Sequence, residues 1–181
     1  MKTIRLTTWI DAPVERCFKL ALSVDLHLVS ARSTGEKMAS GVRSGLLGLE
    51  DTVTWSGRHF GLRFRHTSRI VELRPYLYFC DTMIRGTFQH FEHKHHFAPM
   101  NEGTRMRDEL RFSAPPGLAG VAAELILERH FIHILKERNR LLKQVAESKE
   151  WQRYLVAEVK RKPAVPNPTP RDLREKALHR A

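Results

Sequence analysis

The segment from Phe79 to Phe112 places polar side chains where a β-sheet would bury its inner face. Three runs in this segment alternate apolar and polar residues as β-strands do, because neighbouring side chains of a strand point to opposite faces of the sheet. The face that the apolar residues mark as the inner one also carries Asp81, His93, His95 and Asp108. Burying a charge or an imidazole without partners costs several kcal/mol. The pattern therefore predicts a sheet that encloses a cavity and not only an apolar core.

Each of the three runs contributes to this predicted inner face. Its residues are Phe79, Asp81 and Met83 in the first run, Phe91, His93, His95 and Phe97 in the second, and Met106, Asp108, Leu110 and Phe112 in the third. The opposite face of the third run is charged, with three arginines and one glutamate between residues 105 and 111. Asp108 is therefore expected in the middle of a strand, among buried neighbours.

The residues before this region predict one strand, two helices and a connection. Residues 3–10 alternate as a strand does, and Asp11-Ala12-Pro13 is typical of the start of a helix, because proline is tolerated in the first turn. A second short helix is expected at 24–30. Several glycines then indicate a connection that contains a short strand at 36–40.

From Glu50 to Phe112 the chain is expected to form consecutive antiparallel strands, and one long helix follows them. Breaks between the strands are predicted at Ser56-Gly57, Arg74-Pro75, Gly86 and 99–103. After residues 114–117 the spacing of the apolar residues becomes helical and stays so to about Ser148. The predicted fold class is therefore α+β, with a curved antiparallel sheet wrapped around a long C-terminal helix.

Several short motifs within residues 1–148 resemble those of a known superfamily. They are D-A-P-V-E at 11–15, D-T-V-T-W at 51–55, R-H-F-G at 58–61, T-S-R-I at 67–70, D-T-M-I-R-G-T-F at 81–88, H-K-H-H-F at 93–97, G-T-R-M-R-D at 103–108 and E-R-N at 137–139. In this order they resemble the SRPBCC (START-like) superfamily, in particular the bacterial proteins described as polyketide cyclase/dehydrase. We therefore expect an SRPBCC domain at 1–148 and a basic, proline-containing extension at 149–181.

The resemblance implies a helix-grip fold with a hydrophobic tunnel between the sheet and the terminal helix. Members of the superfamily bind lipids, sterols, polyketides or other apolar molecules there, and they include carriers, sensors and enzymes. We therefore expect this chain to bind a hydrophobic small molecule, such as a lipid, a polyketide or an isoprenoid-like compound. The alternative is a polyketide cyclase/dehydratase-like enzyme, and the fold alone does not choose between the two.

Asp108 and a histidine of the neighbouring strand are the candidate catalytic residues. A turn near residues 98–103 joins the two strands, so Asp108 is expected opposite His93 or His95. An imidazole titrates near neutral pH and a carboxylate can hold its tautomer, which suits proton transfer on an apolar substrate. The same residues also suit a buried, hydrogen-bonded network that only shapes the cavity, and the sequence favours this second role.

No metal ion and no other cofactor are expected. His93 and His95 on one face offer two metal ligands, but a site needs a third ligand at suitable geometry. Only Asp108, Asp81 or His66 can provide it from this sheet.

An apolar lining is expected for the cavity, together with a cation from the long helix. The candidate ligand-binding residues are Trp55, Phe64, Phe79, Asp81, Met83, Phe91, Phe97, Met106, Leu110, Phe112 and Arg129. Arg129 and Arg138 on the long helix are the candidates to present a positive charge to a carboxylate or enolate of the ligand. This composition favours a largely apolar ligand.

The net charge of the chain bears on its possible partners. The net charge of +11 is partly concentrated in the extension, which makes an anionic membrane surface a candidate partner. Nucleic acid is not expected as a partner, because no recognition motif interleaves basic and aromatic residues.

The cysteines and the start of the chain bear on the compartment. Cys17 and Cys80 stand in no CxxC motif, so we expect both to be reduced residues that pack in the core. The start of the chain lacks the pattern of a secretory signal, which favours the cytoplasm.

Overall fold

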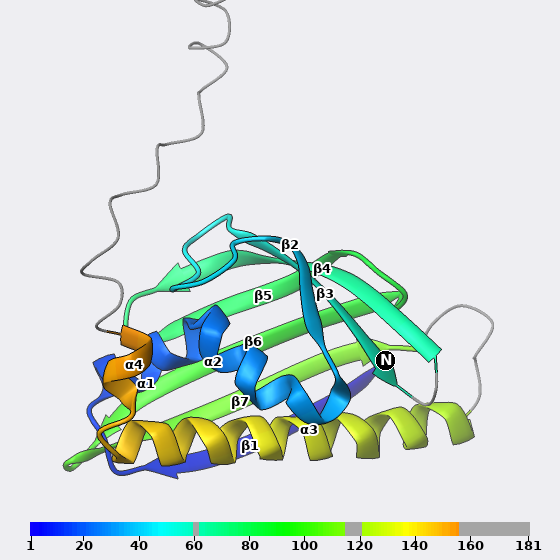
Figure 1. The fold of residues 1–181 in the computed structure, drawn as a ribbon. Helices are drawn as coiled ribbons and strands as arrows, with labels where there is room; N and C mark the ends of the chain where they lie inside the picture. Colours follow the sequence, from blue (N-terminus) through cyan, green and yellow to red (C-terminus); the bar gives the residue numbers. More distant parts are fainter. Residues whose placement is uncertain (60–61, 115–120, 156–181) are drawn as a thin grey trace, which may run out of the picture.

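The computed structural model describes residues 1–59, 62–114 and 121–155, and within this part seven strands form one antiparallel sheet (Figure 1). From one edge to the other the strand order is β1-β7-β6-β5-β4-β3-β2. The strands are β1 (Lys2–Ile10), β2 (Lys37–Gly41), β3 (Thr52–His59), β4 (Leu62–Arg74), β5 (Tyr78–Arg85), β6 (His90–Met100) and β7 (Gly103–Ser113). Strands β3 to β6 each pair with the next strand along the chain, which confirms the predicted meander.

Helices cover one face of this sheet. They are α1 (Val14–Leu22), α2 (Val24–Ser30), the short 3-10 helix η1 (Ala31–Thr34), α3 (Val121–Glu147) and α4 (Trp151–Leu155). Figure 1 shows the long α3 beside β1, with α1 and α2 on the same side of the sheet. The predicted fold class is confirmed, since a curved antiparallel sheet wraps around a long C-terminal helix.

The local sequence explains where the two N-terminal helices begin. Helix α1 follows Pro13, whose φ of −58° is already close to the helical value. Helix α2 begins after Ser23, whose side-chain oxygen accepts a hydrogen bond from the backbone N–H of Leu26 at 3.2 Å. This contact satisfies one of the N–H groups that a helix start leaves without a partner.

Three apolar clusters of buried residues make up the core of the described part of the chain, and the third consists of Val24, Val53 and Trp55. In the first, the ring of Phe18 on α1 meets Phe79 and Phe97 edge-on, with centroids 5.7 and 5.4 Å apart. In the second, Phe112 on β7 contacts Phe131 on α3 with centroids 4.9 Å apart. Side chains of all three clusters line the cavity described below.

One predicted strand break is wrong. Strand β3 continues through Ser56 and Gly57 to its end, and β4 begins at Leu62. A Cβ atom at Gly57 would lie 2.9 Å from Cγ of Glu36, so the glycine allows a close approach of that side chain and does not mark a turn. The other predicted breaks are confirmed, with turns at 75–77, 86–89 and 101–102.

Helix α4 packs on the body of the protein directly after the predicted end of the domain. The guanidinium of Arg16 on α1 lies 4.6 Å from the centre of the Trp151 ring, which is a cation–π contact. Other side chains of α4 are partly buried against the first apolar cluster. The boundary after Ser148 stays a prediction, and residues 156–181 of the extension lie outside the described residues.

Both cysteines are free thiols in the interior. Burial raises the pKa of Cys17 and raises the pKa of Cys80 to about 12. The thiolate is the nucleophilic form of cysteine, so neither residue is activated at neutral pH.

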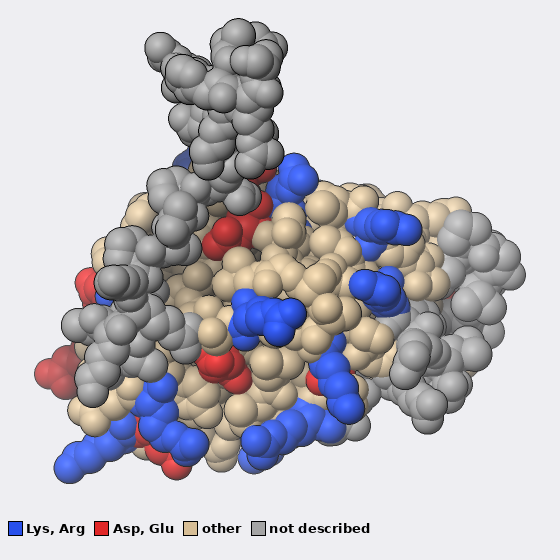
Figure 2. Space-filling model, turned by 45° about the horizontal axis from the view of Figure 1, so that its top comes forward, with Lys and Arg blue, Asp and Glu red and all other residues tan. Residues whose placement is uncertain are grey.

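The distribution of charged side chains on the surface bears on the predicted membrane and nucleic-acid partners. Figure 2 shows the Lys and Arg side chains of one face spread among Asp, Glu and uncharged residues, not gathered into a continuous stripe. No helix in the described part of the chain combines the length and the apolar character needed to cross a membrane.

Candidate functional site

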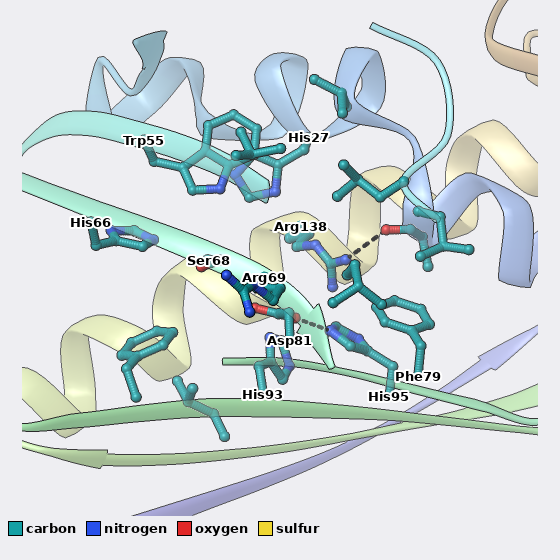
Figure 3. Close-up of a pocket in the computed structure, with 18 of the residues that line it drawn as sticks. His27, Trp55, His66, Ser68, Arg69, Phe79, Asp81, His93, His95 and Arg138 are labelled. Carbon is teal, nitrogen blue, oxygen red and sulfur yellow. Dashed lines mark hydrogen bonds and ion pairs between the residues drawn. The ribbon is translucent and has the colours of Figure 1, made fainter. Parts of the chain in front are cut away.

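The inner face of the sheet and the helices enclose a cavity of about 150 Å³. Its walls come from the strands β3 to β7, from the region of α1 and α2, and from α3. Most of the lining is apolar and includes Val53, Trp55, Ile70, Phe91, Phe131 and Ile134. Polar side chains interrupt this lining on several elements, among them His27 on α2 and Arg69 on β4, and one group of them lies on β5, β6 and α3 (Figure 3).

Strand register explains how the polar side chains meet. Asp81 on β5 pairs with His93 on β6, and His95 on β6 pairs with Asp108 on β7. Since alternate residues of a strand share a face, all four side chains point toward the helices. We call these four residues and Arg138 of α3 the polar cluster.

Asp108 is the centre of the polar cluster and has no exposed side-chain area. Its Oδ1 accepts a hydrogen bond from Nε2 of His93 at 3.0 Å and lies 2.9 Å from Nδ1 of His95. Its Oδ2 accepts a hydrogen bond from Nδ2 of Asn139 on α3 at 2.7 Å. Nη1 of Arg138 lies 3.7 Å from Oδ1. The contact expected between Asp108 and a histidine is present, and both candidate histidines make it.

His95 is held between two carboxylates and an aromatic ring. Its Nε2 lies 3.3 Å from Oδ1 of Asp81, and its Nδ1 faces Asp108. Its ring stacks on Phe79, with centroids 4.1 Å apart and planes inclined by 20°. The ring of His93 lies beside it at a centroid distance of 3.8 Å. These four neighbours together fix the orientation of the His95 ring.

The polar cluster holds its carboxylates ionised and His93 neutral. Burial alone would raise the pKa of Asp108, but the contacts with His93 and His95 outweigh it and keep this pKa well below the usual value. The pKa of Asp81 is lowered in the same way, against burial, by His95, His93 and Arg138. Burial, together with the nearby charge of His95, lowers the pKa of His93 to about 4. At neutral pH the cavity therefore meets a neutral imidazole beside two anionic carboxylates.

Some of the predicted lining residues line the cavity, and others are packed in the core or lie at the end of a strand. The residues that line the cavity are Trp55, Phe79, Asp81, Phe91, His93, His95 and Leu110. Met83, Phe97, Met106 and Phe112 are not among the lining residues. Met106 and Phe97 are covered by α1, Phe112 is packed under α3, and Met83 lies against Gly86 at the end of β5. The side chain of Phe64 lies outside the described residues.

The cation that faces the cavity is Arg138 and not Arg129. Arg129 is exposed and does not line the cavity. The two arginines are nine positions apart, which is two and a half turns of an α-helix, so their side chains leave opposite sides of α3. Arg138 also donates a hydrogen bond from Nη2 to the carbonyl of Ala21 at 3.2 Å, which ties α3 to α1.

Several residues of the site were not proposed from the sequence, and Asn139 and His27 are two of them. Asn139 hydrogen-bonds Asp108, and its position in the middle of the apolar stripe of α3 was a usable signal, because a buried amide needs a partner. His27 on α2 stacks on Trp55 with centroids 4.0 Å apart, and its Nε2 lies 3.4 Å from Oε2 of Glu36. No pattern in the sequence around His27 pointed to the cavity.

No protein-family model matches the chain, and a search of curated proteins found no match. Solved structures do match. The structure of TTHA0849 from Thermus thermophilus is 20% identical with a TM-score of 0.63, and the match covers 81% of this chain and 100% of that one.

Two further structures are similar over most of their length. A START superfamily protein from Mycobacterium smegmatis is 11% identical with a TM-score of 0.58, and the match covers 80% of this chain and 97% of that one. The major latex-like protein 151 from Panax ginseng is 10% identical with the same TM-score of 0.58, and the match covers 81% and 98% of the two chains. At such low sequence identities the matches support the fold alone, so membership of the polyketide cyclase/dehydrase branch stays a prediction. The chain has the helix-grip fold of these START-like structures.

Proposed function

We propose that the protein binds a hydrophobic small molecule in the cavity and places a polar group of that molecule against the polar cluster. The observation that carries this proposal is the composition of the cavity wall, which is mostly apolar and includes the linked polar side chains of Asp81, His93, His95 and Arg138. Apolar walls supply affinity by burying surface, whereas a few polar groups orient the ligand. The exposed fraction of the Asp81 side chain is 21%, so this carboxylate is within reach of a ligand.

The size of the cavity favours a compact ligand. A volume of about 150 Å³ is below the roughly 300 Å³ at which pockets for drug-sized ligands begin. Aromatic side chains form part of the wall, where Phe88, Phe91 and Phe131 lie with ring centroids 5.5 Å apart in each pair. A ring-containing polyketide or isoprenoid-like molecule with one hydroxyl, carbonyl or amine group fits this description better than an extended acyl chain.

Native mass spectrometry of the protein purified from its source tests the proposal directly. We expect a mass above that of the chain alone, and denaturing extraction should release a compact apolar molecule. An extended lipid in the extract would contradict the proposed ligand class. A protein that carries nothing and also binds no apolar probe would contradict the proposed function.

A cavity-filling substitution gives a second test. Ile134→Trp on α3 should weaken binding of the compact fluorescent probe 2-naphthol by about 10-fold or more, because the indole occupies the space that the ligand needs. Ile126→Trp is the matched control, since Ile126 lies on the same helix and is 53% exposed. Equal probe affinity in the two variants would show that the probe does not bind in this cavity.

A polyketide cyclase/dehydratase-like enzyme is the second candidate function, and the hydrogen bond between His93 and Asp108 favours it. A neutral imidazole held by an ionised carboxylate is suited to accept a proton from a ligand. Asp108 itself is fully covered, so in this mechanism it orients the histidine, while His93 and Asp81 face the substrate.

Catalysis and simple binding predict different results for His93→Gln. If the protein turns over the extracted molecule, this variant should lower kcat by about 10²- to 10⁴-fold, the usual contribution of a general base. The affinity for the molecule should change little, because glutamine keeps a polar side chain in the same place. Wild-type protein that leaves the molecule unchanged would set this candidate aside and leave the binding function.

The proposed contact of the extension with an anionic membrane surface rests on its charge alone. The basic residues at 160–162 belong to the part of the chain outside the described residues. Neither this partner nor the predicted cytoplasmic location enters the argument for the cavity.

A further inference from the structure

Three side chains of the polar cluster are arranged as metal ligands. Asp81, His93 and His95 each offer one ligand atom, and these atoms all lie within 4.8 Å of one another. Figure 3 shows the three side chains meeting below Arg69, with His93 and His95 rising from one strand and Asp81 from the next. The sequence argued against a metal because a third ligand was in doubt, and the pairing of β5 with β6 supplies that ligand.

The kind of these ligands, and the spacing of two of them, fit a divalent transition metal. Two imidazoles and one carboxylate that leave coordination positions open are typical of catalytic zinc sites and of non-haem iron sites. Bonds of 2.0–2.1 Å around a tetrahedral Zn²⁺ ion separate the ligand atoms by about 3.3 Å. Nε2 of His95 and Oδ1 of Asp81 are already 3.3 Å apart. These two atoms can hold an ion without moving relative to each other.

Asp108 occupies the place of the outer carboxylate in such a site. A histidine that binds a metal through one ring nitrogen usually donates its other N–H to a carboxylate, which fixes the ring. With Nε2 of His95 on the metal, its proton sits on Nδ1. This buried nitrogen lies 2.9 Å from Oδ1 of Asp108. Asp108 is itself anchored by Asn139, so the outer shell is already built.

The surroundings of the three ligands are charged. Two carboxylates, those of Asp81 and Asp108, lie near two guanidiniums, those of Arg138 and Arg69. The site is closed to bulk water on the side of Asp108, which has no exposed side-chain area. The open coordination positions would face the cavity, because Asp81, His93 and His95 all line it.

We propose that Asp81, His93 and His95 form a binding site for a divalent transition-metal ion, and that Zn²⁺ fits these ligands. The proposal goes beyond ligand binding in the cavity and does not depend on which organic molecule enters it. A polar group of such a molecule would complete the coordination of the ion.

Zinc titration of the untagged, metal-free full-length chain tests the site. Isothermal titration calorimetry with ZnCl₂ should show tight binding that Asp81→Asn weakens by about 100-fold or more, because one ligand is lost. Asp108→Asn should weaken binding by about 10- to 100-fold, as expected for an outer-shell carboxylate. His96→Gln is the control, since His96 directly follows His95 but lies on the opposite face of β6, where its ring contacts Tyr78. The zinc affinity of this variant should match that of the wild type.

X-ray absorption spectroscopy of the zinc-loaded wild type keeps the test independent of any variant's folding. Two imidazoles and oxygen ligands in the first shell are expected. Absence of zinc binding, fewer than two imidazoles, or unchanged affinity in Asp81→Asn would each overturn the proposal. Ile134→Trp should keep its zinc affinity while it loses the 2-naphthol probe, so failure of the metal site and failure of the proposed ligand binding give different results.

Discussion

Asp108→Ala is expected to lower the free energy of unfolding by about 3–5 kcal/mol, the usual effect of removing one partner from a buried charged network. The substitution removes the acceptor that His93 and Asn139 share, and it leaves the guanidinium of Arg138 without its nearest carboxylate in this network. Polar groups that stay buried without a partner carry their full desolvation cost. Urea denaturation followed by circular dichroism measures the change.

Two further variants show whether the loss comes from the network. Glu92→Ala removes a carboxylate from the outer face of β6, where it pairs with Lys94 at 3.3 Å, and it should cost at most about 1 kcal/mol. Asp108→Asn should cost less than Asp108→Ala, because Asn139 can turn its Oδ1, which has no hydrogen-bond partner within the described part of the chain, toward the new amide. Equal losses in Asp108→Ala and Glu92→Ala would mean that the polar cluster does not stabilise the fold.

The stability of the protein is expected to fall by about 3 kcal/mol as the pH is lowered from about 6.5 to about 4, through the protonation of His93 alone. In the folded protein burial lowers the pKa of His93 to about 4, whereas its ordinary value is 6.5. Between these two values the unfolded chain binds a proton that the folded protein does not, so acid shifts the equilibrium toward unfolding. One pH unit corresponds to about 1.4 kcal/mol, which sets the size of the effect.

The carboxylates of Asp108 and Asp81 change the stability of the protein only at lower pH. The pKa values of Asp108 and Asp81 are lowered in the folded protein, so their contribution is complete above the ordinary value near 3.8 and is lost below it. Urea midpoints measured between pH 4.5 and 7.5 therefore exclude the carboxylates and report on His93 together with His96, whose pKa burial also lowers. His93→Gln should remove most of the slope in this range, and an unchanged slope in that variant would assign the effect to another group.

The strands of the site were predictable because their pattern is local. Alternation with a period of two assigned Met106, Asp108, Leu110 and Phe112 to one face of β7, and all four are buried there. The same pattern on β6, together with a short turn, predicted that Asp108 lies near His93 and His95. Strand alternation and turn position are properties of residues close in the chain, so they do not depend on the rest of the fold.

The division between cavity and core was not predictable in this way. Phe97 and Phe91 share a face of β6, but Phe18 of α1 covers Phe97, whereas Phe91 reaches the cavity. Which side chains a helix covers depends on where it docks on the sheet. The strand pattern carries no information on that position.

The sequence by itself determined the sheet faces, the long helix and the presence of polar residues inside the sheet, because each is written in a short-range periodicity. Only the tertiary structure decided which residues of other elements join Asp108 and the two histidines. Helix α3 turns Arg138 and Asn139 toward Asp108 and Arg129 toward solvent, and β5 brings Asp81 to His95 from fourteen positions away. The rotation of a helix about its axis and the register between strands are set by packing over the whole interface, so no single segment encodes them.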